Sequence, residues 1–303
     1  MRVLVTGAAG FLGDHVCTAI GRQGMHELLI TRRTETDLRS RMLTLDLMAK
    51  AKPEAVIHLA ARVGGIGANQ KYPATFWREN LEMGMNVLEA CSLAKVKKLV
   101  MVGTTCSYPR APRIPFREAD LFDGYPEDTN APYGIAKRAL IVGAEAYRKE
   151  FGLNAVTVIP TNLYGPWDNF DPESSHVIPA MIRKYHEAMV RDDDIVELWG
   201  TGSPTRDFLY VEDAAMAIVE ALEKLDGPAP VNLGSGHEVS IREISQQIAR
   251  MVGYRGVTKW DASQPDGQPR RCLDTSRAAD LLGWRSTTTL HEGLRKTYDW
   301  WLK

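Results

Sequence analysis

The chain begins MRVLVTGAAGFLG, three evenly spaced glycines directly after a run of β-forming apolar residues. Gly7, Gly10 and Gly13 give the pattern GxxGxxG, and a helical stretch, DHVCTAIGRQG, follows them. In such a strand–turn–helix unit the first glycine permits a tight turn and the second lets the backbone approach a pyrophosphate. The third allows the helix to pack closely on the strand. The chain start therefore predicts a dinucleotide site at a helix N-terminus, with a plain glycine turn as the alternative.

Short apolar runs alternate with helical patterns through the first half of the chain. They read RVLVTG, HELLIT, AVIHLAA, KLVMVGT and AVTVIP, each rich in Val, Ile or Leu. This alternation is typical of repeated βαβ units, whose parallel sheet is buried on both faces. We expect an α/β protein with a Rossmann-like doubly wound parallel sheet.

The pattern becomes irregular after about residue 160, where Gly, Pro, Asn and Trp cluster in TNLYGPWDNFDPESSH. The later segment RDFLYVEDAAMAIVEALEKL returns to a strand-and-helix pattern. A length of 303 residues accommodates one large domain or two modest ones. We predict a dinucleotide-binding domain at 1–162 plus about 207–230. About 163–206 plus 231–303 would form a smaller, discontinuous α+β substrate domain.

Composition excludes several classes of function. The formal net charge is −1, so neither a polyanion nor an anionic membrane is expected as a partner. No apolar run approaches the roughly 20 residues that span a bilayer, and the N-terminus lacks the features of a signal peptide. The four cysteines are widely spaced without a CxxC pair, which argues against a zinc site or a disulfide framework. We expect no metal and a reducing cytoplasm.

The residues after the second predicted strand indicate which dinucleotide binds. A carboxylate there usually holds the ribose 2′-OH of NAD. Here HELLI is followed by Thr31, Arg32 and Arg33, with no acid immediately after the strand. Two guanidinium groups suit the 2′-phosphate of NADP. We therefore predict NADP(H), with two solvated surface arginines as the alternative.

A Tyr-x3-Lys pair indicates hydride-transfer chemistry. Tyr133 and Lys137 would lie one turn apart on one helix face. A phenol has a pKa near 10, and a neighbouring ammonium is expected to lower that pKa towards the working range. A hydroxyl at the end of the fourth strand, from Thr104 or Thr105, would complete the set by hydrogen-bonding the reacting carbonyl oxygen.

Two long helical patterns, at about 75–94 and 133–151, carry apolar residues at helical spacing. Their second faces also contain Met85 and Ile141. They could simply cover the sheet, or they could form a helix-bundle interface in a homodimer.

Longer strings make the resemblance to one family specific: HLAARVGGIGANQKYP, GTTCSYP, PTNLYGPWDNFDPESSHVIPA, WGTGSPTRDFLYVEDAA and DASQPDGQPRRCLD. With the glycine loop and Tyr-x3-Lys, they resemble the extended short-chain dehydrogenase/reductases, in particular its GDP-sugar epimerase/reductases. The resemblance runs from Arg2 to about Trp300. It implies 3,5-epimerisation and NADPH-dependent 4-reduction of GDP-4-keto-6-deoxy-D-mannose by a homodimer.

The resemblance also gives Cys106 a role, although a buried cysteine is by default a small hydrophobe. It implies that Cys106 and His176 are paired acid–base groups across the sugar. Protons at C3 and C5 are acidified by the C4 ketone, and thiol and imidazole titrate close enough to neutrality to remove and return them. Tyr133 and Lys137, with Thr104, would serve the reduction.

The binding sites that the resemblance implies are as follows. The cofactor would contact Gly7, Ala8, Ala9, Gly10, Phe11, Leu12, Gly13, the segment from Arg33 to Leu38, Val102, Gly103, Thr104, Thr105, Lys137, Pro160, Thr161, Asn162, Leu163 and His176. The nucleotide sugar would contact Lys184, Trp199, Arg206, Asp266 and Arg271.

Two alternatives remain, and departures from the family pattern bear on the first. Thr104 stands where serine is common, Lys184 replaces an arginine, and Arg271 replaces a lysine. Ala8 replaces an arginine found in some members, which would leave more of the 2′-phosphate binding to Arg33. One alternative is a relative acting on another GDP-4-keto sugar, of the heptose or colitose type, by epimerisation, reduction or both. The other is a non-catalytic NADP-binding regulator, which should lack parts of the catalytic set.

Overall fold

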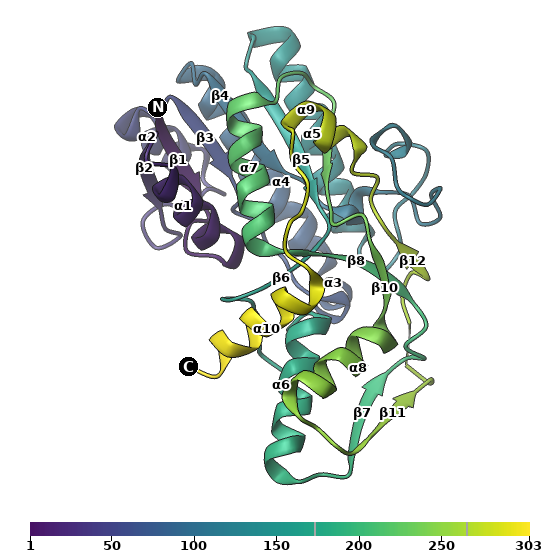
Figure 1. Ribbon diagram of the computed structural model, residues 1–303. Helices are drawn as coiled ribbons and strands as arrows, with labels where there is room; N and C mark the ends of the chain where they lie inside the picture. Colours follow the sequence, from purple (N-terminus) through teal and green to yellow (C-terminus); the bar gives the residue numbers. More distant parts are fainter. Residues whose placement is uncertain (173, 265) are drawn as a thin grey trace.

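The computed structural model describes residues 1–172, 174–264 and 266–303. Its larger layer is a six-stranded parallel sheet in the order β2-β1-β3-β4-β5-β9 (Figure 1). The strands are β1 (Arg2–Thr6), β2 (Glu27–Thr31), β3 (Ala55–His58), β4 (Lys98–Val102), β5 (Ala155–Pro160) and β9 (Val231–Leu233). The expected Rossmann-like doubly wound sheet is confirmed, and the chain switches direction across the sheet between β1 and β3.

Helices cover both faces of this sheet, which explains why its central strands are continuous apolar runs. One face packs against α1 (Phe11–Gln23), α7 (Val211–Lys224) and α9 (Ser276–Leu282). The other packs against α2 (Arg41–Ala51), α4 (Pro73–Leu93) and α5 (Ala131–Phe151). Short turns of helix, α3 (Ile66–Lys71), η1 (Thr105–Ser107) and η2 (Glu118–Asp120), lie in the connections.

The smaller layer is built from short strands and from helices around its own apolar core. Its strands are β6 (Asn162–Tyr164), β8 (Thr205–Tyr210), β10 (Glu238–Ser240) and β12 (Arg270–Arg271), plus the separate pair β7 (Ile195–Trp199) and β11 (Val257–Asp261). Its helices are α6 (Val177–Arg191), α8 (Ile241–Val252) and α10 (Leu290–Trp301). These elements lie below the large sheet in Figure 1, and α10 crosses between the two parts.

One boundary of the predicted domain division needs correction. The sequence grouped 231–303 with the smaller domain, but β9 pairs with β5 and completes the large sheet. Ala278 and Leu282 of α9 are buried in the same core as that sheet. A three-residue strand carries too little periodicity to reveal which sheet it joins.

A second correction concerns the helix faces considered for a dimer. Ile141 is buried with Tyr108, Phe116 and Ile159, so it does not belong to a free second face. Met85 is 57% exposed and Val142 is 52% exposed. The outward face of α4 and α5 therefore includes Met85 and Val142, while Ile141 helps to fix α5 on the sheet.

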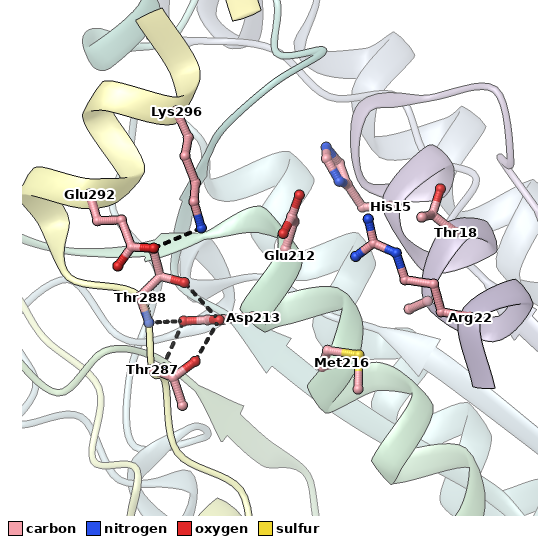
Figure 2. Close-up of a pocket in the computed structure, with 11 residues that line it drawn as sticks. His15, Thr18, Arg22, Glu212, Asp213, Met216, Thr287, Thr288, Glu292 and Lys296 are labelled. Atoms are coloured by element: carbon pink, nitrogen blue, oxygen red, sulfur yellow. Dashed lines mark hydrogen bonds and ion pairs between the residues drawn. The ribbon is translucent and has the colours of Figure 1, made fainter. Parts of the chain in front are cut away.

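The connection into α10 is fixed by one buried carboxylate. Asp213, at the start of α7, accepts hydrogen bonds from the backbone N–H groups of Thr287 and Thr288 at 2.9 and 2.8 Å (Figure 2). The hydroxyl groups of both threonines donate to it as well. Helix α10 is thereby tied to the helix layer of the large sheet.

Candidate active site

The glycine loop fits a dinucleotide phosphate. Gly7 has φ +74°, a left-handed conformation that favours glycine, and a Cβ on Gly13 would lie 2.1 Å from the Gly7 carbonyl oxygen. Gly10 caps α1 without a side-chain hydrogen bond to the described first turn. The amide groups of that turn are thus available to an anion, and the helix dipole favours negative charge there. The loop lies at the carboxyl end of β1, beside the switch point.

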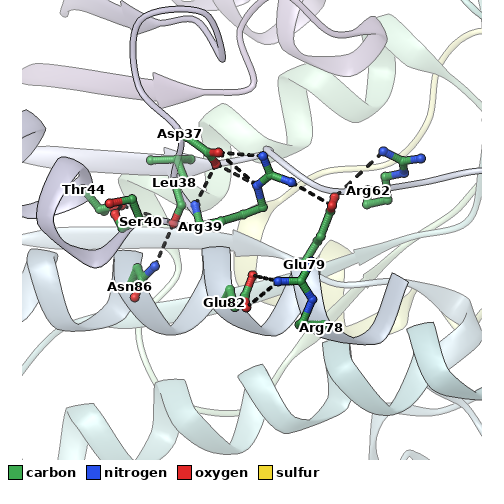
Figure 3. Close-up of polar contacts among 10 residues, drawn as sticks. All are labelled: Asp37, Leu38, Arg39, Ser40, Thr44, Arg62, Arg78, Glu79, Glu82 and Asn86. Carbon is green, nitrogen blue, oxygen red and sulfur yellow. Dashed lines mark hydrogen bonds and ion pairs between the residues drawn. The ribbon is translucent and has the colours of Figure 1, made fainter. Parts of the chain in front are cut away.

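A charged network surrounds the segment after β2 that is predicted to contact the cofactor (Figure 3). Arg33 is exposed just after β2, whereas Leu38 is buried and its carbonyl accepts a hydrogen bond from Asn86 Nδ2 at 2.8 Å. Hydrogen bonds from Arg39 lower the pKa of the Asp37 carboxyl to about 2, and the charge of Arg33 adds to this.

Sequence reasoning missed the partner that anchors this segment to α4. Arg39 Nη1 donates to Glu79 Oε1 at 2.8 Å, and Glu79 is itself buried. Arg62 lies 3.9 Å from the other Glu79 oxygen. A carboxylate between two guanidinium groups from different loops fixes the distance between those loops. No local pattern could have indicated a pairing across 40 residues.

At the carboxyl end of β4 the chain turns into η1, which brings the predicted hydroxyl and thiol beside α5. Thr104 Oγ1 accepts a hydrogen bond from the backbone N–H of Cys106 at 3.2 Å. A Cβ on Gly134 would lie 2.1 Å from the Cys106 carbonyl oxygen, so turn and helix are in backbone contact. Tyr133 precedes that glycine. Its hydroxyl is hydrogen-bonded to Thr104, and it lies close enough to Cys106 for a charge on that thiol to affect its pKa. The structure therefore places Thr104, Cys106 and Tyr133 together.

The predicted direction of the Tyr133 pKa shift is wrong. Burial raises this pKa well above its usual range, a negative charge on Cys106 would raise it further, and the hydrogen bond with Thr104 lowers it by less. Desolvation disfavours phenolate and outweighs the expected effect of a cation. The ring also meets Phe76 edge to face, at 6.2 Å between centroids. Tyr133 is consequently held as a neutral phenol that carries a proton.

Lys137 lies on α5, one turn after Tyr133. Its Nζ donates to the Val102 carbonyl at 3.0 Å, and burial lowers its pKa to about 8. The nearby His58, which sequence reasoning did not single out, is hydrogen-bonded to Thr6 Oγ1 at 2.8 Å. Burial, and then the Lys137 charge, lower the His58 pKa to about 3. His58 thus lies at the carboxyl end of β3 as a buried, neutral polar group.

His176 lies at the other predicted acid–base position, at the N-cap of α6, with its side chain 51% exposed. Its Nδ1 is 3.9 Å from Oδ1 of the buried Asp168. The loop runs beside the glycines after β3, since a Cβ on Gly65 would lie 3.8 Å from the Ser175 carbonyl oxygen. Thr161, in the predicted cofactor segment, donates to the Asp207 carbonyl at 3.1 Å, which ties β5 to the smaller layer.

The two arginines predicted for the sugar nucleotide lie side by side, because Arg206 on β8 and Arg271 on β12 are register partners. Burial, and then the charge of Arg271, lower the Arg206 pKa to about 10. Arg271 reaches Gln268 Oε1 at 3.0 Å and Thr105 Oγ1 at 3.5 Å, close to η1. Two crowded cations next to the Thr104–Cys106 turn suit a ligand with two negative charges, such as a pyrophosphate.

The remaining predicted sugar-site residues surround the end of β7. Trp199 is 69% exposed, and Lys184 Nζ donates to the Glu197 carbonyl at 3.1 Å. Asp266 accepts hydrogen bonds from the backbone N–H and hydroxyl of Thr201, both at 2.7 Å. Its visible role is therefore to shape the turn after Trp199. An exposed indole leaves an apolar face for stacking.

A cavity of about 300 Å³ lies elsewhere, between α1, α7 and α10 (Figure 2). Its charged lining comes from Arg22, Glu212, Glu292 and Lys296. Among the residues that the structure describes, none of the predicted site residues lines it. It therefore belongs to neither predicted site.

The phosphate loop, the Tyr-x3-Lys helix and the strand-end hydroxyl define a nucleotide-dependent enzyme of the extended short-chain dehydrogenase/reductase class. The chain belongs to the NAD dependent epimerase/dehydratase family, whose model matches residues 3–234. Among its relatives is GDP-L-fucose synthase 1 from Arabidopsis thaliana, 43% identical over 100% of this chain and 93% of that protein.

Two solved structures resemble the whole chain. A GDP-6-OMe-4-keto-L-xylo-heptose reductase from C. jejuni superimposes with a TM-score of 0.94 at 28% identity, covering 99% of this chain and 97% of that one. A GDP-L-fucose synthetase from Naegleria fowleri bound to NADP gives 0.91 at 28% identity, covering 99% and 94%. Both similarities extend through the smaller layer as well as the large sheet.

Proposed function

We propose that this protein converts GDP-4-keto-6-deoxy-D-mannose into GDP-L-fucose by epimerising C3 and C5 and then reducing C4 with NADPH. The whole-chain similarity to GDP-L-fucose synthase 1 supports the substrate, and the NADP-bound relative supports the cofactor. Arg33 is exposed just after β2, and no carboxylate directly follows that strand. Arg33 is therefore the expected ligand of the 2′-phosphate.

In the epimerase step Cys106 and His176 exchange protons at the two carbons beside the C4 ketone. One group removes a proton from one face, and the other returns a proton to the opposite face. The electron pair left on carbon is delocalised onto the ketone oxygen, which the Thr104 hydroxyl and Tyr133 stabilise by hydrogen bonds.

In the reductase step Tyr133 gives its proton to the C4 oxygen. Bound NADPH supplies the hydride. The raised pKa of Tyr133 keeps it protonated until charge develops on that oxygen, and Lys137 then stabilises the phenolate that remains. Lys137 needs its proton for this, and its pKa of about 8 allows that at neutral pH.

Arg206 and Arg271 hold the pyrophosphate of the nucleotide, and Trp199 and Lys184 contact the rest of the GDP moiety. The register that sets the two guanidinium groups side by side, next to the turn that bears Cys106, carries this proposal. This arrangement supports a GDP-sugar anchored with its ketone close to Tyr133.

The test uses purified protein, GDP-4-keto-6-deoxymannose and NADPH in D2O, with NMR of the product. NADPH consumption with deuterium at both C3 and C5 is expected. Deuterium incorporation without NADPH consumption would leave an epimerase alone. Absence of both signals would refute the substrate.

A second candidate is a reductase or epimerase of another GDP-4-keto sugar, of the heptose or colitose type. The TM-score of 0.94 with the C. jejuni heptose reductase favours it, as do the altered sugar-site residues Thr104 and Lys184. A panel of GDP-keto sugars, compared by kcat/KM, discriminates the two. The deoxymannose derivative should exceed the others if the leading proposal holds.

We further propose a homodimer in the reducing cytoplasm. Trp77 (46% exposed), Met85 and Val142 are exposed apolar side chains on α4 and α5, and they support this proposal. No described helix is long and apolar enough to cross a membrane, and all four cysteines are free. Light scattering should give twice the chain mass, and Val142→Glu should yield a monomer.

A further inference from the structure

A buried carboxylate, Asp168, lies under the loop that presents His176. Its side chain is only 3% exposed. Oδ1 accepts a hydrogen bond from the Asn169 backbone N–H at 2.7 Å, whereas Oδ2 is buried without a hydrogen-bond partner in the part of the chain that the structure describes. Burying a charged group with unfilled acceptor sites is costly. Fold stability alone gives no reason for a carboxylate at this position.

The loop is built so that this carboxylate faces His176. Trp167, immediately before Asp168, has φ +67°, a left-handed conformation that is costly for a side chain of its size. Its ring packs against Trp300 with 5.1 Å between centroids, and Phe170 stacks on Trp301 at 5.5 Å. Two aromatic contacts with α10 therefore hold the loop on either side of Asp168.

His176 Nδ1 is the ring nitrogen that faces Asp168, and about half of the His176 side chain is exposed. The 3.9 Å between His176 Nδ1 and Asp168 Oδ1 exceeds a hydrogen bond of about 2.7–3.2 Å. Catalytic hydrogen bonds are often long before substrate binds and shorten in the complex. An Nδ1–H group directed at the carboxylate fixes the tautomer and leaves Nε2 for the sugar.

We propose that Asp168 is a positioning residue that orients His176 and stabilises the imidazolium formed during epimerisation. The inference rests on the proposed function of His176. As a base, Nε2 takes a proton from the carbon beside the ketone; as an acid, it returns one. The His176 ring is cationic after it has taken a proton or before it returns one, and the Asp168 carboxylate compensates that charge in either case.

The test is a double-mutant cycle with Asp168→Asn and His176→Asn, each alone and combined. Asp171 is an exposed carboxylate of the same loop, so Asp171→Asn is the matched control. Deuterium incorporation at C3 and at C5 is followed separately by NMR, with NADP⁺ present so that no reduction occurs. The isotope effect of C4-deuterated NADPH on kcat/KM is measured alongside. Thermal midpoint and NADPH affinity show whether each variant is folded.

The loss of Asp168 should slow exchange at C3 and C5 by on the order of 10- to 100-fold, because His176 takes part in proton transfer at both carbons; this is part of the 10²–10⁴ that general acid–base catalysis supplies. The Asp171→Asn control should exchange both at the wild-type rate. The NADPH isotope effect should fall towards unity, because proton transfer becomes more rate-limiting. In the His176→Asn background, Asp168→Asn should cost nothing further.

Two results would overturn the inference, and they differ from each other. Effects that multiply in the double variant, or slowing matched by a loss of thermal stability or of NADPH affinity, would make Asp168 a structural residue only. Undiminished exchange at both carbons in His176→Asn alone would remove His176 from the proposed function and the inference with it. If Asp168→Asn does not fold, Asp168→Glu serves instead, with partial retention of the exchange at C3 and C5 as the expected result.

Discussion

The two groups proposed to move protons at the sugar carbons lie in contrasting surroundings. Cys106 belongs to a turn locked between β4 and α5, where a Cβ on Gly134 would be 2.1 Å from its carbonyl oxygen. His176 lies at the end of a loop, with its side chain 51% exposed and its nearest carboxylate 3.9 Å away. The proposed site thus joins a half fixed by packing at the large sheet to a half carried on an exposed loop of the smaller layer.

The largest effect should come from the half fixed by packing at the large sheet. Tyr133→Phe removes the proton that C4 reduction requires, so NADPH consumption should fall by about 10²–10⁴-fold, or roughly 3–5 kcal/mol. Deuterium incorporation at C3 and C5 should persist at a reduced rate, because Cys106 and His176 remain while one hydrogen bond to the ketone oxygen is lost. Stopped-flow absorbance and NMR measure the two steps separately. Normal NADPH consumption by this variant would remove Tyr133 from the proton-donor role.

A smaller effect should follow when the packing of the same half is disturbed. Gly134→Ala places a methyl group against the Cys106 backbone, and overpacking typically costs about 1–3 kcal/mol of unfolding free energy. Gly21→Ala is the matched control, since nothing lies within 4 Å of its Cβ position and alanine favours a helix by roughly 0.5–1 kcal/mol. Urea denaturation should show the first variant destabilised and the second stabilised. Equal stability of the two would mean that turn and helix are less tightly joined than described.

The pH dependence tests the buried cation. Because burial lowers the Lys137 pKa to about 8, kcat/KM for reduction should fall about tenfold per pH unit above that value. Stability should move in the opposite direction: between about 8 and 10.5 the unfolded chain binds more protons at this lysine than the folded one, so its contribution to the unfolding free energy rises with pH. Loss of activity together with unfolding in this window would contradict the assignment, and residual activity of Lys137→Arg should lack this pH limb.

The sequence predicted the large sheet better than it predicted the short strands and the loops. β1 to β5, α1, α4 and α5 were correctly placed, because buried parallel strands are continuous apolar runs and long helices carry a clear period. β9 was misplaced because its three residues carry no such signal. Asp168 and Glu79 escaped notice since their partners are distant in sequence or in a loop without periodicity. The Tyr133 pKa was predicted in the wrong direction because burial cannot be seen in a spacing motif.

The smallest effect concerns the other cysteines and completes the contrast. Burial, and then the charge of Asp14, raise the pKa of Cys17 to about 11, and burial raises that of Cys272 to about 12 and that of Cys91 higher still. At pH 8 only about one Cys17 in a thousand is thiolate, the form that iodoacetamide alkylates. Cys17→Ser should therefore leave both the reaction rate and the inactivation by iodoacetamide within about twofold of the wild type. Inactivation should instead disappear in Cys106→Ser. Protection by Cys17→Ser would show that the sensitive thiol lies on α1, and would return Cys106 to a packing role.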